Sequence, residues 1–167
     1  MNMRSLLHQF VWFLDTPRII YDREGKEPYL SRWYLIRSKP EPDDTLIGQP
    51  SESNKPRLFD LYLHRFHRSD DDQALHNHPV SWALSFVLAG GYTEERRFGD
   101  HLVQVRTVRP FRFNFIRKED YHRVDLLEED AWSLFLVGPK IDTWYFWDRK
   151  TKVKTHWRRF IEEKRNA

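Results

Sequence analysis

An all-β fold is predicted by the middle of this 167-residue chain, where short segments of alternating apolar and polar residues follow one another. Such alternation is typical of strands with one buried face. Glycine, aspartate and proline separate the segments at short intervals, which favours an antiparallel sandwich or barrel. Stretches with helical character lie near both termini. We therefore predict an antiparallel β-sandwich or barrel with short N- and C-terminal helices.

The elements are expected in the following order. Ser5 is the candidate cap of a short helix that runs to about Leu14, and Pro17 ends or redirects it. Residues 39–57 contain four prolines and predict a long loop. Gly90 and Gly91 are suited to a tight hairpin turn between two strands. The strands are expected at 29–38, 58–67, 75–78, 81–89, 92–98, 101–108, 111–116, 121–127 and 132–137, and the last helix at 155–164.

Length and composition restrict the class of protein. The chain has the length of one domain, 1–167, with a core at about 58–137 and a C-terminal extension at 138–167. A hydrophobic content of 40%, with 16% aromatic residues, excludes a disordered chain. No apolar run approaches the roughly 20 residues that cross a bilayer, and the N-terminus lacks a signal-peptide cleavage site. We therefore expect a cytoplasmic protein without a membrane partner.

Charge and cysteine content exclude further functions. The formal net charge is +3, and the charges are interspersed except in the locally basic segment 150–159. Nucleic-acid binding normally needs a stronger basic stripe, so a nucleic-acid partner is not expected. Because the chain has no cysteine, it has no disulfide, no thiolate metal ligand and no cysteine nucleophile.

Three histidines are the candidate metal ligands. His76 and His78 are two residues apart, so in a strand their side chains point to the same face. His122 lies within another predicted strand and can complete a facial set. Imidazole suits Fe, Zn, Cu and Ni alike, so the ligand type does not select the metal. The alternative is that His76 and His78 are polar strand residues near a surface turn.

The residues around these histidines resemble the cupin superfamily. His76-x-His78 and the following segment 82–91 are similar to the first cupin motif, which runs H-x-H, three or four residues, Glu, six residues, Gly. Residues 120–124 resemble the second motif, Pro-x-Gly-x-x-His, although Arg117 and Glu119 stand at its Pro and Gly positions. The resemblance covers residues 58–137 and implies a cupin-like jelly roll.

The resemblance also implies a ligand set and an activity. Trp82 or Ala83 occupies the place of the usual glutamate ligand, which implies a three-histidine site made of His76, His78 and His122. Similar cupins imply one divalent transition metal, Fe(II) ahead of Zn, Ni, Mn or Cu, and a homodimer. The implied function is a mononuclear non-haem Fe(II) oxygenase that acts on a small molecule, and several three-histidine cupins suggest a dioxygenase. The alternatives are a non-catalytic small-molecule or metal-binding cupin, and a metal-independent sugar isomerase or epimerase.

Several acidic residues are candidates for further roles near the metal. If Gly90 and Gly91 form a hairpin turn, Glu94 pairs near Val87, several residues along the strand from His78, which is more than about 10 Å away and too far for a ligand. Asp70, Asp71 and Asp72 are expected to be solvated or to form a turn. Asp120 is a candidate to orient an imidazole, with a turn acid as the alternative.

His64 is the candidate catalytic residue. It shares a strand face with Tyr62 and Phe66, whereas His67 faces the other side. In that position His64 is an acid/base group or a substrate contact, and a structural histidine is the alternative.

Overall fold

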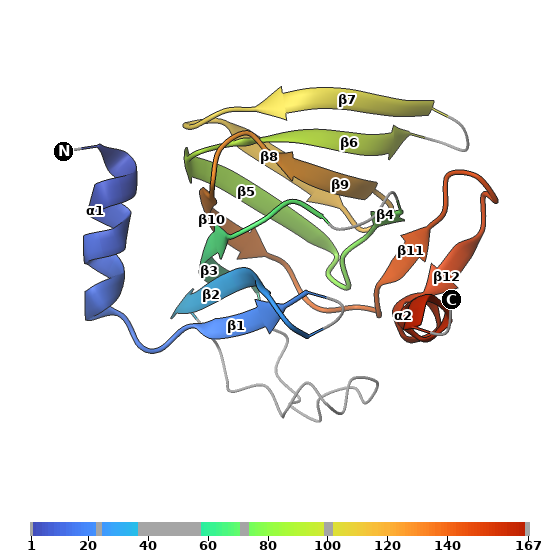
Figure 1. Cartoon of the computed structure of the whole chain (residues 1–167), viewed down its shortest axis with the longest axis horizontal. Helices are drawn as coiled ribbons and strands as arrows, with labels where there is room; N and C mark the ends of the chain where they lie inside the picture. Colours follow the sequence, from blue (N-terminus) through green and yellow to red (C-terminus); the bar gives the residue numbers. More distant parts are fainter. Residues whose placement is uncertain (1, 23–24, 37–57, 71–73, 99–101, 166–167) are drawn as a thin grey trace.

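Two six-stranded antiparallel sheets form the body of the protein in a computed structural model that describes residues 2–22, 25–36, 58–70, 74–98 and 102–165 (Figure 1). We call them sheet A and sheet B. Sheet A contains, in spatial order, β1 (Arg18–Tyr21), β2 (Pro28–Ile36), β3 (Asp60–Phe66), β10 (Ala131–Val137), β5 (Trp82–Ala89) and β8 (Phe113–Arg117). Sheet B contains β12 (Lys154–His156), β11 (Tyr145–Trp147), β4 (Leu75–His76), β9 (Tyr121–Leu126), β6 (Tyr92–Phe98) and β7 (Leu102–Val108). The predicted antiparallel β-sandwich is confirmed.

The two sheets face each other through the alternating residues of their strands. In β5 every second residue is buried, and Val87 at its centre is 0% exposed. Val87 packs against Tyr92 of β6, Val108 of β7 and Val124 of β9. Full burial of a valine side chain stabilises the fold by roughly 1.5–3 kcal/mol. The small-residue face of β5 therefore packs, at this point, against the opposite sheet.

The N-terminal helix α1 (Met3–Phe10) packs against sheet A through Leu7, which joins a buried cluster with Trp33 and Trp132. Its cap is Asn2 rather than the expected Ser5, because Asn2 Oδ1 accepts the backbone N–H of Ser5 at 2.9 Å. Asparagine is as good a cap as serine, and it stands at the residue before the first helical turn.

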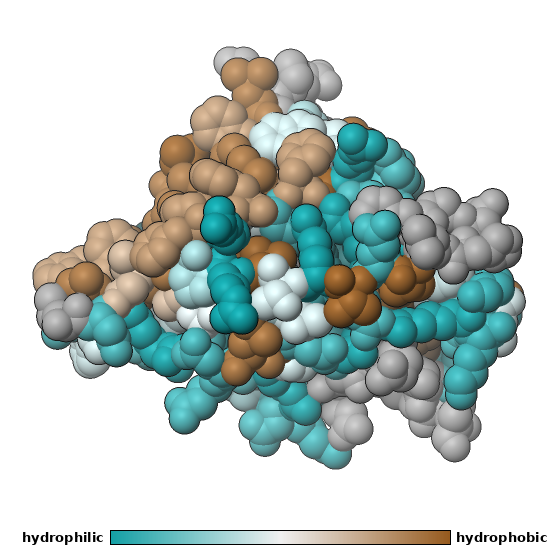
Figure 2. Space-filling view, turned by 90° about the horizontal axis from the view of Figure 1, so that it is seen from above, coloured by the Kyte–Doolittle hydropathy of each residue, from teal (hydrophilic) through white to brown (hydrophobic). Residues whose placement is uncertain are grey.

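The short helix η1 (Val11–Phe13) follows α1 and leaves large apolar side chains on the surface. Trp12 is 87% exposed and Phe13 is 86% exposed. Figure 2 shows hydrophobic residues gathered over the end of the molecule that carries α1.

The C-terminal helix α2 (Trp157–Arg165) confirms the helix expected at 155–164. Phe160 stacks on Phe146 of β11 with ring centroids 4.2 Å apart, and Trp157 stacks on Trp144. These contacts place α2 beside β11 and β12 (Figure 1). Within the described residues, no helix is long and apolar enough to cross a membrane.

The hairpin predicted at Gly90 and Gly91 is wrong. β5 pairs with β10 and β8 in sheet A, whereas β6 pairs with β7 and β9 in sheet B, so the two glycines carry the chain from one sheet to the other. Both have positive φ, 73° and 110°. A Cβ atom on Gly90 would lie 2.1 Å from the carbonyl oxygen of Asp130, so this crossing also requires close backbone contact. The loop predicted at 39–57 lies outside the described residues.

Candidate metal centre

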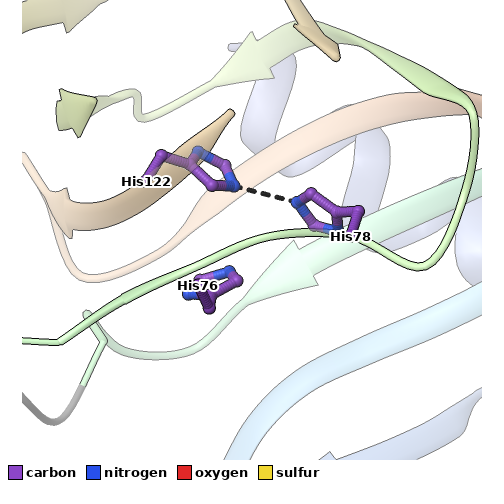
Figure 3. A group of neighbouring side chains, drawn as sticks. All are labelled: His76, His78 and His122. Atoms are coloured by element: carbon purple, nitrogen blue, oxygen red, sulfur yellow. Dashed lines mark hydrogen bonds between the residues drawn. The ribbon is translucent and has the colours of Figure 1, made fainter. Parts of the chain in front are cut away.

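Three imidazoles converge between the sheets (Figure 3). His76 ends β4 and is paired in register with His122 on β9. His78 lies two residues beyond His76, after the strand has ended, and not within it as expected. One nitrogen of each ring lies within 4.8 Å of the others, and Nε2 of His78 is 2.9 Å from Nε2 of His122.

Asn77 holds the segment that carries the two neighbouring histidines. Its side chain is 4% exposed and donates to the carbonyl oxygen of Lys118 at 3.2 Å. It also accepts the backbone N–H of Tyr145 at 2.7 Å. Because β4 is only two residues long, these bonds fix the backbone where the sheet ladder no longer does.

The nitrogen atoms of this group fit a divalent transition metal. His122 donates its Nδ1–H to Oε1 of Glu94 at 2.7 Å, since an ionised carboxylate only accepts, and this leaves a lone pair on Nε2. Burial, followed by the charges of His122 and His76, lowers the pKa of His78 well below 6.5, so His78 is neutral. Two nitrogen ligands at about 2.1 Å and a right angle lie about 3.0 Å apart. The 2.9 Å separation between His78 and His122 matches this spacing.

Glu94 is the orienting carboxylate, a role for which the sequence pointed to Asp120. Its side chain is 0% exposed, and Oε1 also accepts from Arg96 at 2.9 Å and from Asn114 at 3.0 Å. Oε2 accepts from Arg106 at 2.6 Å. Burial raises the pKa of the Glu94 carboxyl, but the bonds and charges of His122 and Arg96 outweigh it and lower the pKa, so Glu94 is ionised.

Asp120 has a different role from the one considered for it. Its Oδ2 accepts from Arg96 Nη1 at 2.9 Å and from the backbone N–H of Arg117 at 2.9 Å. It therefore holds the arginine that in turn contacts Glu94. The sequence holds one signal for this network, because Tyr92, Glu94 and Arg96 occupy alternate positions of one predicted strand and so share a face. In the structure all three residues are buried.

Asp70 was expected to be a solvated turn residue, and the structure shows that its carboxylate is instead bonded within the protein. Its Oδ1 accepts from the Tyr29 hydroxyl at 2.6 Å, and its Oδ2 accepts from the backbone N–H of Val124 at 2.7 Å. The same Oδ2 lies 3.8 Å from Nδ1 of His76. Asp70 thus fixes the chain next to this histidine, while Asp71 and Asp72 lie outside the described residues.

His64 does not belong to the three-histidine group. It is 2% exposed, and its Nε2 accepts from Arg32 Nε at 2.9 Å. Its ring stacks on Tyr62 and on Phe135, with centroids 5.7 Å and 4.8 Å away. The ring centroid of Phe135 also lies 5.8 Å from that of His78, so the Phe135 side chain lies between His64 and the three-histidine group. Its catalytic role stays a prediction.

Buried neutral histidines make the stability of the metal-free protein depend on pH. Burial, and then the charge of Arg32, lowers the pKa of His64 well below 6.5, so the unfolded chain binds a proton that the folded chain does not. The free energy of unfolding should therefore decrease as the pH falls below 6.5, by at most about 1.4 kcal/mol per pH unit for each such histidine. Urea unfolding of chelator-treated protein between pH 7 and pH 5, compared with His64→Gln, checks this. Equal slopes for the two proteins would contradict it.

The fold is similar to that of solved cupin-fold proteins. Oxalate decarboxylase from Bacillus subtilis superposes with a TM-score of 0.50 at 12% identity, over 75% of this chain and 28% of that chain. KdgF from Halomonas sp. gives a TM-score of 0.46 at 17% identity, over 70% of this chain and 85% of that one. Oxalate oxidase in complex with glycolate gives 0.43 at 13% identity, over 52% of this chain and 44% of the other.

At these identities the likeness concerns the fold, and the chain has the cupin fold. This confirms the cupin-like jelly roll expected from the two motifs. The chain spans less than half the length of oxalate oxidase and oxalate decarboxylase. No family model matches the sequence, and no curated protein matches it.

Proposed function

We propose that this protein is a metal-dependent cupin enzyme that binds one Fe(II) ion through His76, His78 and His122 and acts on a small molecule. The observation that carries the proposal is the convergence of three imidazole nitrogens within 4.8 Å, with Nε2 of His78 and Nε2 of His122 2.9 Å apart. Imidazole alone does not select iron, and the resemblance to three-histidine cupins favours it. A bound Fe(II) ion supplies Lewis-acid polarisation and the redox chemistry of non-haem oxygenases.

The side chains around the group prepare it for such an ion. Glu94 holds the tautomer of His122 whose Nε2 is unprotonated, and this hydrogen bond makes the imidazole a more basic ligand. His122 is 4% exposed, and the ring of Phe135 lies against His78, which keeps bulk water from this side of the histidines. Three protein nitrogens would leave further coordination positions of such an ion open to a substrate.

A metal-independent isomerase is a weaker alternative. Such an enzyme needs a general acid or base whose pKa lies near the working pH. Burial lowers the pKa of both His64 and His78 well below 6.5, so neither is a good proton donor at neutral pH. A non-catalytic metal-binding cupin has the same donor atoms and is separated from an enzyme only by turnover.

Removal of one ligand should abolish the stoichiometric metal. Tag-free protein reconstituted anaerobically with Fe(II) should contain about one ion per chain, and His76→Ala should contain almost none. His67→Ala is the control, because His67 lies outside the group and contacts Ser31 Oγ at 2.7 Å. Elemental analysis measures the content. Equal metal in the wild type and His76→Ala would overturn the assignment.

Oxygen consumption with a panel of small oxygenated molecules tests the enzymatic part of the proposal. Uptake that requires both iron and a substrate supports an oxygenase. Stoichiometric iron without oxygen uptake or any conversion of the substrates would favour the non-catalytic binder. Conversion of a substrate that consumes no oxygen and persists in chelator would favour the isomerase.

A further inference from the structure

A row of polar side chains crosses sheet A beside the three-histidine group. Arg32 of β2 is paired in register with His64 of β3, and His64 is paired with Ser133 of β10. Directly opposed residues of antiparallel strands share one face of the sheet. That face is the inner one, because Phe135, two residues after Ser133, contacts both His64 and His78.

Two atoms of this row are buried without a hydrogen-bond partner in the described part of the chain. They are Nδ1 of His64 and Oγ of Ser133, and each residue is only 2% exposed. Arg32 donates to Nε2 of His64, so the neutral ring carries its proton on Nδ1 and offers a buried donor. A buried polar atom left unpaired costs about 1–3 kcal/mol. A ligand that accepts hydrogen bonds would remove this cost.

Arg32 adds a positive charge to the same row. Its Nε is bonded to His64 and its guanidinium lies 4.8 Å from the ring centroid of Tyr62. Among the described residues, no carboxylate forms an ion pair with Arg32, and its two Nη atoms have no hydrogen-bond partner. A partly buried arginine is normally paired, and its planar fork matches a carboxylate with two parallel hydrogen bonds.

The acids nearest to this region are already engaged. Glu94 is held by two arginines behind His122, and Asp70 accepts from Tyr29 and a backbone N–H. Asp60 accepts from the Tyr62 hydroxyl and lies four residues from His64, which is about 13 Å along the strand. Three neutral imidazoles leave the charge of a divalent metal uncompensated, so the metal and Arg32 together favour an anionic ligand.

We propose that Arg32, His64 and Ser133 bind the carboxylate of a small acidic substrate, whose other end reaches the three-histidine group. This inference deepens the function proposed above and rests on it for the role of the three histidines. Arg32 supplies the charge and the fork, while the Nδ1–H of His64 and the Ser133 hydroxyl supply two further donors. The substrate class is therefore small carboxylic acids rather than neutral sugars.

Calorimetric titration with malonate, and with its neutral counterpart malonamide, tests the subsite in both metal-loaded and metal-free protein. The wild type should bind malonate and not malonamide. Arg32→Gln should weaken malonate binding by about ten- to a hundredfold, as expected for the loss of a charged hydrogen-bonding partner. Arg32→Lys should recover part of the affinity, because it keeps the charge without the fork. Ser133→Ala should cause a smaller loss, and the exposed Arg117→Gln on β8 none.

The outcomes separate this inference from the proposed function. Malonate binding that is absent, or equal in the wild type and Arg32→Gln, overturns the subsite and leaves a water molecule as the partner of the two buried atoms. Arg32-dependent binding in protein that takes up no Fe(II) on reconstitution supports the subsite and counts against the metal enzyme. Circular dichroism checks the fold, and Arg32→Lys and Ser133→Ala decide the question if Arg32→Gln does not fold.

Discussion

Glu94→Gln should lower the free energy of unfolding by about 3 kcal/mol and weaken metal binding by about ten- to a hundredfold. The Glu94 carboxylate accepts from four donors among the described residues, namely His122, Arg96, Asn114 and Arg106. A glutamine presents an N–H₂ group to at least one of them, so one buried donor must face another. The negative charge that balances Arg96 is also lost. We place the cost at the low end of the range for a broken buried ion pair because the Arg106 side chain is 46% exposed.

The effect on the metal should arise through His122. Without a carboxylate at Nδ1, the ring loses the hydrogen bond that fixes its orientation and its tautomer. Urea unfolding of metal-free protein measures the first effect, and competition with a chelator measures the second. Glu119→Gln is the control, because Glu119 is exposed and lies three residues before His122. Unchanged metal affinity in Glu94→Gln would contradict the assigned role.

The histidines of the candidate site could be located from the sequence through short motifs rather than through strand geometry, since His78 lies beyond the end of β4. His76 and His78 form a short motif, and His122 lies in a strand pattern that the resemblance to cupins singled out. The residues that support them could not be found in the same way. Asn77 acts through bonds to distant segments, at Lys118 and Tyr145, which no local pattern indicates.

Glu94 was missed for a topological reason. The prediction paired β5 with β6 and so placed Glu94 beside Val87, far from His78. In the structure β6 pairs instead with β9, where Arg96 lies opposite His122 and Glu94 lies opposite Val124. Alternation correctly predicts which residues of a strand face inward, but it does not say which strand lies next to it. A different limit explains why β1, β11 and β12 were not predicted. Each has only three or four residues, which is too short for an alternating pattern to indicate a strand.

Gly90→Ala should lower the free energy of unfolding by about 3 kcal/mol or more, because two costs add at this position. A residue with a Cβ is disfavoured by about 1–2 kcal/mol at φ 73°. The new Cβ would also lie 2.1 Å from the Asp130 carbonyl oxygen and 3.0 Å from the Ala131 Cα. Both are backbone atoms at the start of β10, so relief of the clash must move a central strand of sheet A away from the crossing to sheet B.

Gly25→Ala separates these two costs. Gly25 has nearly the same φ, 72°, but apart from its chain neighbours no atom of the described residues lies within 4 Å of the position that its Cβ would take. It should therefore lose only about 1–2 kcal/mol, the cost of the left-handed conformation. Urea unfolding of the metal-free variants, followed by tryptophan fluorescence, measures both losses. Equal losses for Gly90→Ala and Gly25→Ala would mean that the close contact with Asp130 does not constrain the crossing. A larger loss at Gly90 would identify this glycine as the residue that lets the chain pass from the sheet of Arg32 and His64 to the sheet of His76 and His122.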